Sequence, residues 1–207
     1  MPIITAIKPQ KNKKRVNIHL DGKFGFGIDL ENFVKLGLKV EQELSEREIE
    51  EIIKKAEFQK TYDKLVRFAT LRPRSEKEVN DWLRKYKVHE SIHKELFIRL
   101  KRLDLLDDKK FAQWWVEQRT TFRPRGKRAL SFELRQKGID RDLINQILSE
   151  AKIDEQKIAS QLLEKKKYKW ERLGKLEARK KMSEFLARKG FSWTVIKESI
   201  DVFSEKS

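Results

Sequence analysis

The last three quarters of the sequence repeat the same apolar pattern three times. When Leu83 is placed over Leu134 and Leu186, apolar residues also coincide at three other positions of each copy. These positions are Val79, Leu130 and Met182, then Val88, Ile139 and Phe191, then Ile92, Leu143 and Val195. A repeat of this length, about 50 residues, is one supersecondary unit, so the pattern predicts stacked modules that each contribute a small core.

In each copy, residues that typically start or end helices divide the sequence into three helical segments. In the second copy, Asp107 is a suitable N-cap for a first helix, and Pro124 disfavours helical geometry at the residue before it. Gly138 is placed to end the second helix in a left-handed conformation, as is Gly190 in the third copy. Asp140 then caps the third helix. The pattern predicts three-helix modules without strands.

The first copy departs from this plan at its second helix end. Ser75 and Glu78 form a capping box at the helix start, but Lys87 stands where the other copies have glycine. A left-handed lysine costs about 1 kcal/mol, so the helix either tolerates that strain or ends differently. His89 takes the capping place of Asp140 or Ser192.

The first 44 residues have another periodicity. Residues 16–20 and 24–28 alternate apolar and polar side chains around Asp21-Gly22, which predicts a β-hairpin, with a further strand at 3–7. Gly25 and Gly27 predict a twisted or bulged return strand. A short helix ending at Gly37 follows.

The fold class is therefore mainly α. We expect an elongated, curved array of three tandem three-helix repeats, preceded by a small β-hairpin and helix extension. A capping box at Ser45 and Glu48 opens a long helix that leads into the first repeat. The expected domains are residues 1–44 for the extension, 45–106 for the long helix with the first repeat, 107–152 for the second repeat and 153–207 for the third.

The charge of the chain indicates a polyanionic partner. The formal net charge is +16, and residues 1–58 carry 11 Lys and Arg against 10 Asp and Glu, so the excess lies in the repeats. The chain has no cysteine, which excludes disulfides, and no run of 18 apolar residues. We expect a cytoplasmic protein without membrane contact.

Two near copies of a basic corner lie in register in the first two repeats. LRPRS at 71–75 and FRPRG at 122–126 each place arginines around a proline before a helix, where free amides and guanidinium groups suit a phosphate or carboxylate. The alternative is that these arginines solvate the surface or pair with local acids. In the third repeat WERLGK replaces the corner. The candidate residues for binding a polyanion are Arg72, Arg74, Lys77, Arg123, Arg125, Lys127, Arg128, Arg135, Lys175, Arg179, Lys180 and Lys181.

The five tryptophans raise the possibility of base stacking. Helical spacing predicts that Trp82 and Trp115 are core residues, and Trp193 is expected to pack beside Phe191. Trp114 either seals a joint between repeats or meets a partner. Trp170, in a basic loop, is the best candidate for an exposed aromatic contact.

A formal match to a zinc-protease motif occurs at residues 89–93, HESIH. The repeat register places His89 at a helix cap and His93 beside the core, with no third histidine at hand. No phosphate-cradling glycine loop or cysteine nucleophile is present. We therefore expect no catalytic residue, no metal site and no cofactor.

The three-helix units also suggest a sequence-reading helix-turn-helix regulator. In that class the last helix enters the major groove, yet Asp140, Asp142 and Glu150 line this helix in the second repeat, and phosphates would repel them. A general DNA-binding repeat protein and a purely structural scaffold remain alternatives. A scaffold role accounts for the repeats but gives no reason for their excess of positive charge.

Several segments together resemble the RecX family, bacterial regulators of the recombinase RecA. These are the connector RLDLLDDKKFAQWWVEQR, the RPR corner, the helix end ELRQKGI and its echo FLARKGF. The resemblance covers nearly everything from residue 59 onward, and the first 58 residues resemble the extension of longer members.

The resemblance implies a non-enzymatic regulator in homologous recombination, DNA repair and the SOS response. It implies an all-helical array that binds the groove of the RecA filament and single- and double-stranded DNA, and that limits filament extension or promotes disassembly. We expect the regulator to be a monomer. Lys87 and the altered third corner depart from the family pattern.

Overall fold

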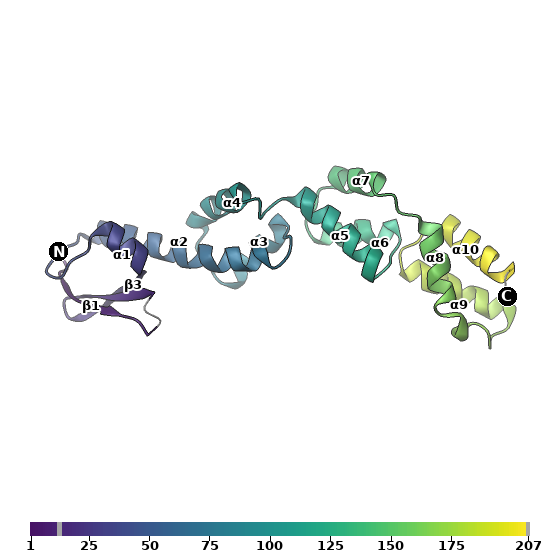
Figure 1. Ribbon diagram of the computed structural model, residues 1–207, viewed down its shortest axis with the longest axis horizontal. Coiled ribbons are helices and arrows are strands. Elements are labelled where there is room, and N and C mark those ends of the chain that lie inside the picture. The colour runs from purple at the N-terminus through teal and green to yellow at the C-terminus, as the bar shows by residue number, and fades with distance from the viewer. Residues whose placement is uncertain (12–13, 206–207) are drawn as a thin grey trace. The chain divides into compact units, whose positions relative to one another are not determined.

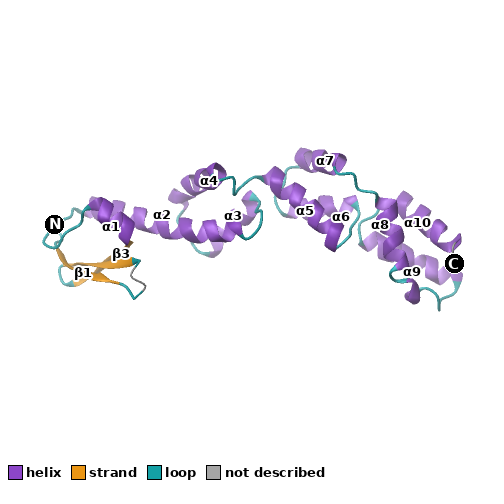
Figure 2. Ribbon diagram, in the orientation of Figure 1, coloured by secondary structure: helices purple, strands orange, loops and turns teal. Residues whose placement is uncertain are grey.

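The computed structural model describes residues 1–11 and 14–205, and the described chain follows the three-copy plan (Figure 1). Strands lie only in the amino-terminal part of this described chain, and helices follow (Figure 2). The chain divides into two compact units, Met1–Arg72 with Leu83–Leu105 and Pro73–Trp82 with Leu106–Ser207. The mainly α fold with an amino-terminal sheet is as predicted.

The first unit begins with an antiparallel sheet in the order β1-β2-β3. Its strands are β1 Ile4–Pro9, β2 Arg15–Leu20 and β3 Lys23–Asp29. Asp21 and Gly22 form the predicted turn, with φ of 47° and 80°. Ile18 pairs with Phe26 and His19 with Phe24, so Gly25 is the extra residue of a bulge, as expected for glycine in this strand.

Two helices cover this sheet. Helix α1, Leu30–Leu36, ends at Gly37 with φ of 59°, and α2, Glu46–Thr70, starts from the Ser45 and Glu48 capping box. The hydrogen bonds from Ser45 lower the pKa of Glu48. Ile52 and Ala56 of α2 are buried in the same core as the sheet residues Ile4, Val16, Ile18, Phe26 and Ile28.

The second helix of the first repeat ends with a strained lysine. After α3, Glu76–Lys85, Lys87 has φ of 52°, the same left-handed region as Gly138 at 81° and Gly190 at 84°. The first repeat therefore tolerates the strain and keeps the same chain path. The turn η1, Glu90–Ile92, and helix α4, His93–Arg102, follow.

The second unit contains two further three-helix modules. The helices of the second repeat are α5 Asp108–Phe122, α6 Lys127–Gln136 and α7 Arg141–Glu150. Those of the third repeat are α8 Glu155–Glu164, α9 Lys175–Arg188 and α10 Trp193–Glu205, with a short turn η2 at Lys167–Lys169. Each module has its own buried cluster, one around Phe111 and Leu134 and one around Leu186 and Phe191. The small separate cores match the repeat pattern.

Successive repeats of this unit meet through the ends of their second helices. The amide of Gly126, at the start of α6, donates to the carbonyl of Lys189 at the end of α9, at 3.0 Å. A Cβ on Gly190 would lie 2.3 Å from the Cβ of Ala129, and one on Gly138 would lie 2.7 Å from the Cβ of Lys77 on α3. The glycines thus allow both a left-handed turn and close contact between helix ends.

A carboxylate from the following repeat completes each joint. Asp108, the first residue of α5, accepts a hydrogen bond from the amide of Glu76, the first residue of α3, at 2.8 Å. Glu155, the first residue of α8, accepts one from the amide of Lys127, the first residue of α6, at 2.9 Å. An acidic group at a helix start is favoured by the helix dipole, so the two joints share one mechanism.

Replacing Gly190 with alanine should loosen the joint between the second and third repeats. The left-handed φ alone costs about 1 kcal/mol, and the overlap with Ala129 adds about 1–3 kcal/mol. Gly37→Ala is the matched control, because Gly37 also has a positive φ but nothing within 4 Å of its added Cβ. Urea denaturation should show a larger loss for Gly190→Ala, and equal losses would mean that the helix ends are not in close contact.

Candidate polyanion-binding surface

The first backbone amides after the two basic corners already donate hydrogen bonds within the protein. Because Asp108 and Glu155 accept from the first amides of α3 and α6, these amides are not free to hold a phosphate. This corrects the expectation that each corner exposes open helix amides. The anion that the corner attracts is a carboxylate of the next repeat.

Arg74 of the first corner belongs to the inside of the joint. Its side chain is 11% exposed and lies 3.8 Å from Glu78, which also pairs with Lys137 of the second repeat at 2.6 Å. A cation that is buried beside its counter-ion is poorly placed to meet an outside anion. The pairing of Arg74 with Glu78 favours a role in joining the two repeats, and its binding of a polyanion stays a prediction.

Arg125 of the second corner is likewise held by an internal acid. Glu133 of α6 accepts hydrogen bonds from the indole of Trp115 at 2.9 Å and from Arg119 at 2.7 Å. The Nε atom of Arg125 lies 2.9 Å from the other carboxylate oxygen of Glu133. This distance makes an ion pair, but Nε forms no hydrogen bond with any described residue. The guanidinium of Arg119 also stacks over the ring of Trp115. This cluster fixes α5 and the corner on α6.

Three other candidates form ion pairs at the surface. Lys77 pairs with Asp81, Arg179 with Asp201 and Lys181 with Glu177, at 3.1, 2.7 and 2.7 Å. Exposed pairs of this kind contribute little stability. An external phosphate can therefore compete for these cations at small cost.

The remaining candidates divide by their surroundings. Arg72 is half-buried. In the described part of the chain no ion pair occupies the side chains of Arg123, Lys127, Arg128, Arg135, Lys175 and Lys180. Arg128 and Arg135 lie seven residues apart on α6, with the exposed ring of Phe132 between them, so these three share one helical face.

The joint between the second and third repeats has a positive local potential. Burial lowers the pKa of Lys189, and the nearby cations Arg125 and Lys166 lower it further. The cause is repulsion between like charges around the end of α9. A bound anion at this place would relieve that repulsion.

The aromatic predictions need two corrections. Trp170 is buried, packs on Phe185 and donates its indole N–H to the carbonyl of Leu163 at 3.4 Å, so it is not an exposed contact. Trp193 is 67% exposed and does not pack into the core beside Phe191. Trp114 is half-buried against Phe111 and Trp115, which favours a packing role.

The two histidines of the HESIH segment have local roles. His89 accepts a hydrogen bond from the amide of Ser91 and caps η1, while Nε2 of His93 lies 3.0 Å from the carbonyl oxygen of Val88. Among the residues with described positions, no three acidic or histidine side chains gather as a metal site. No described helix is both long and apolar enough to cross a membrane.

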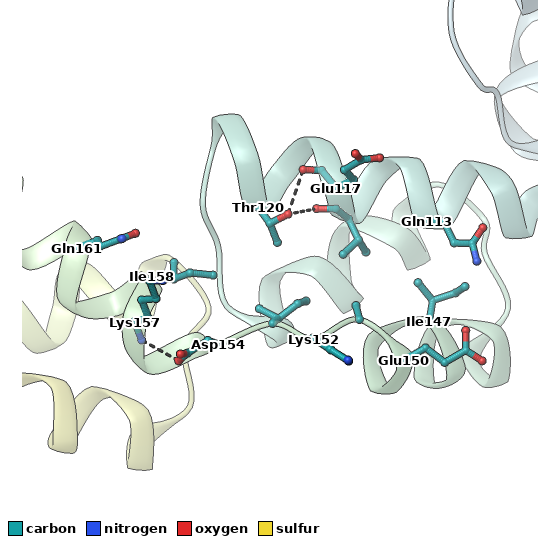
Figure 3. Close-up of a pocket in the computed structure, with 13 residues that line it drawn as sticks. Gln113, Glu117, Thr120, Ile147, Glu150, Lys152, Asp154, Lys157, Ile158 and Gln161 are labelled. Atoms are coloured by element: carbon teal, nitrogen blue, oxygen red, sulfur yellow. Dashed lines mark hydrogen bonds between the residues drawn. The ribbon is translucent and has the colours of Figure 1, made fainter.

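Hollows on the surface of the second unit offer places where a partner could bind. One, of about 520 Å³, lies between α5, the end of α7 and the start of α8, with Val116, Ile147 and Ile153 as its apolar lining (Figure 3). The acids Glu117, Glu150 and Asp154 outnumber the cations Lys152 and Lys157 in its lining, so it is a poor site for a polyanion. Two other hollows share Trp193 and are lined by basic residues of α6, α9 and α10.

The sequence analysis did not assign four residues of these two hollows to a binding surface. They are Phe132, Arg188, Trp193 and Lys197. A signal for Phe132 was present, because it is two residues from both Leu130 and Leu134 and so lies opposite their buried stripe. Trp193 directly follows the cap residue Ser192, a position where the side chain can stay outside the helix bundle.

These features define a class of protein: a helical repeat with small cores, internally paired joints and a basic surface. The chain matches three parts of one known family. Residues 2–45 match the regulatory protein RecX N-terminal domain, 107–148 the second three-helix domain of RecX, and 154–200 its third three-helix domain.

Similar proteins agree with this assignment. A regulatory protein RecX from Bacillus licheniformis is 38% identical over 206 residues, which span 97% of this chain and 77% of that protein. One from Bacillus subtilis is 36% identical over 203 residues, with the same shares. A crystal structure of a regulatory protein RecX superposes with a TM-score of 0.72, at 25% identity, and covers 97% of this chain and 100% of that one. The chain belongs to the RecX family of regulatory proteins.

Removing Glu133 should destabilise the second repeat. Glu133→Ala leaves Arg119, Arg125 and the indole N–H of Trp115 without their shared partner, at a cost of about 1–3 kcal/mol. The exposed acid Glu184 on α9 provides the control, since surface substitutions usually change stability by less than about 0.5 kcal/mol. If urea denaturation of Glu133→Ala and Glu184→Ala gives the same midpoint, the cluster has no structural role.

Proposed function

We propose that this chain binds the RecA filament on DNA through its unpaired cations and regulates recombination without chemistry of its own. Its relatives are named regulatory proteins, and the family has been established for this chain. The filament is a polyanion because it contains DNA, which suits a chain with net charge +16. Acting as a monomer in the bacterial cytoplasm, the protein limits filament extension or promotes disassembly.

The observation that carries this proposal is the separation of the cations into two groups. Arg74, Arg125 and Lys137 are held by acids inside the joints. Arg128 and Arg135 project from one face of α6 and form no ion pair with the described residues. A surface that leaves cations unpaired is typical of a site for an external anion.

A binding surface on the second helices favours contact with backbone phosphates over base reading. The third helix of the second repeat, α7, begins at Asp140 and has Asp142 in its first turn and Glu150 at its end. These acids would face phosphates if α7 entered a major groove, which disfavours a helix-turn-helix regulator. Phosphate contacts position a protein on DNA without sequence choice.

Adding the protein to RecA in a strand-exchange or DNA-dependent ATPase assay should lower both activities. The effect is expected at amounts stoichiometric with RecA, because the protein acts by binding and does not turn over. Unchanged exchange and ATPase rates at that ratio would contradict the RecA part of the proposal. DNA binding without an effect on RecA would favour a general DNA-binding repeat protein.

The triple variant Arg123→Gln, Arg128→Gln, Arg135→Gln should bind DNA more weakly and with a shallower salt dependence. Each lost phosphate contact on a single strand lowers the slope of log K against log salt by about 0.7, so a drop of about 2 is expected. None of these residues has an ion pair with the described chain, so the melting temperature should not change.

A matched control removes the same charge from the first unit. Lys8, Lys23 and Lys39 are exposed residues of the nearly neutral amino-terminal segment. Their change to glutamine should leave the salt slope unchanged. Equal losses in the two triple variants would show that net charge alone, and not the surface formed by Arg123 and α6, determines binding.

A further inference from the structure

Trp193 stands between two hollows that are both lined by basic side chains. It is the first residue of α10, and its side chain is 67% exposed. One hollow, of about 550 Å³, is lined by Arg128 and Phe132 of α6 and by Arg188 at the end of α9. The other, of about 530 Å³, is lined by Arg179, Lys180 and Lys197.

The exposed aromatic rings have no structural explanation in their own modules. Phe132 is 57% exposed on the face of α6 that points away from Leu130 and Leu134, which are fully buried. Trp193 is likewise outside the core that contains Phe191 and Ile196. Two large rings are exposed to water at one hollow. They therefore lack the favourable free energy that burial gives to other large apolar side chains.

The charges around these rings select the chemistry of the occupant. Arg128, Arg188 and Lys197 form no ion pair with any described residue, and all three are exposed. Glu133, which lines the first hollow, is already neutralised by Arg119 and Arg125. The second hollow contains the acid Glu184 against Lys180 and Lys197, and its third cation, Arg179, pairs with Asp201. The occupant must therefore be anionic and must offer flat apolar surfaces.

We propose that Trp193 and Phe132 are stacking platforms for the bases of a single nucleic-acid strand, whose phosphates contact Arg128, Arg188 and Lys197. The inference rests on the proposed function and names the form of DNA that this surface prefers. Bases of a single strand expose their faces, whereas those of a duplex are already stacked on each other and cannot cover an indole. A protein partner would instead bury the rings in a core depleted of charge, which these hollows do not offer.

The test measures DNA binding in the absence of RecA. Wild-type protein, Trp193→Ala and Trp193→Phe are titrated with a 20-nucleotide oligo-dT and with a hairpin duplex of equal phosphate number. Stacking of a base on an aromatic ring contributes to affinity, so Trp193→Ala should lose roughly tenfold in affinity for oligo-dT. Its affinity for the duplex should change less than twofold, and Trp193→Phe should retain most of the binding.

Tyr168→Ala is the control for a general aromatic effect. Tyr168 is 66% exposed in the same unit but does not line either hollow. It should bind oligo-dT like the wild type. Trp193→Ala should also bind oligo-U more weakly than the wild type does, because stacking on a base does not depend on whether the sugar is ribose or deoxyribose.

Two results would overturn the inference while leaving the proposed function in place. Equal losses on oligo-dT and duplex would show that Trp193 supports a phosphate site and not stacking. Unchanged DNA binding by Trp193→Ala, together with weaker inhibition of RecA, would show that the ring meets protein. If the wild type binds neither DNA, the DNA part of the proposed function is itself wrong.

Discussion

The contact between the ends of successive second helices is the interaction on which the second unit depends. Each joint combines a left-handed glycine in close contact with the start of the second helix of the preceding repeat, and a carboxylate from the following repeat that accepts a hydrogen bond from the first amide of that helix. These features satisfy polar groups that a helix end would otherwise leave open. The modules have small cores of their own, so such joints contribute a large share of what holds neighbours together.

The same joints decide which positive charges are available for binding. Glu78 and Glu133, on the helices that start at the two corners, hold Arg74 and Arg125. Arg128 and Arg135 lie near the start and the end of α6 and form no ion pair with the described residues. Duplicated RPR corners thus mark a repeated structural joint, while the surface proposed to bind a polyanion lies on the helix that starts there.

Much of the fold was predictable because it follows from local chemistry. Positive-φ glycines, cap residues and the Asp21-Gly22 turn act within a few residues of themselves, and all appear where the sequence places them. The roles of Arg125 and Trp170 were not predictable in this way, since Glu133 and Phe185 reach them from other elements. A basic neighbourhood in the sequence does not say which side of the chain a ring or guanidinium faces.

Hydrogen exchange in the complete complex tests the central claim most directly. The protein would be measured by mass spectrometry alone and when bound to RecA assembled on single-stranded DNA. Exchange should be slower in peptides that cover residues 123–135 and 175–197, with little change in the strands β1 to β3. Unchanged exchange in both of those segments, with protection elsewhere in the chain, would contradict it.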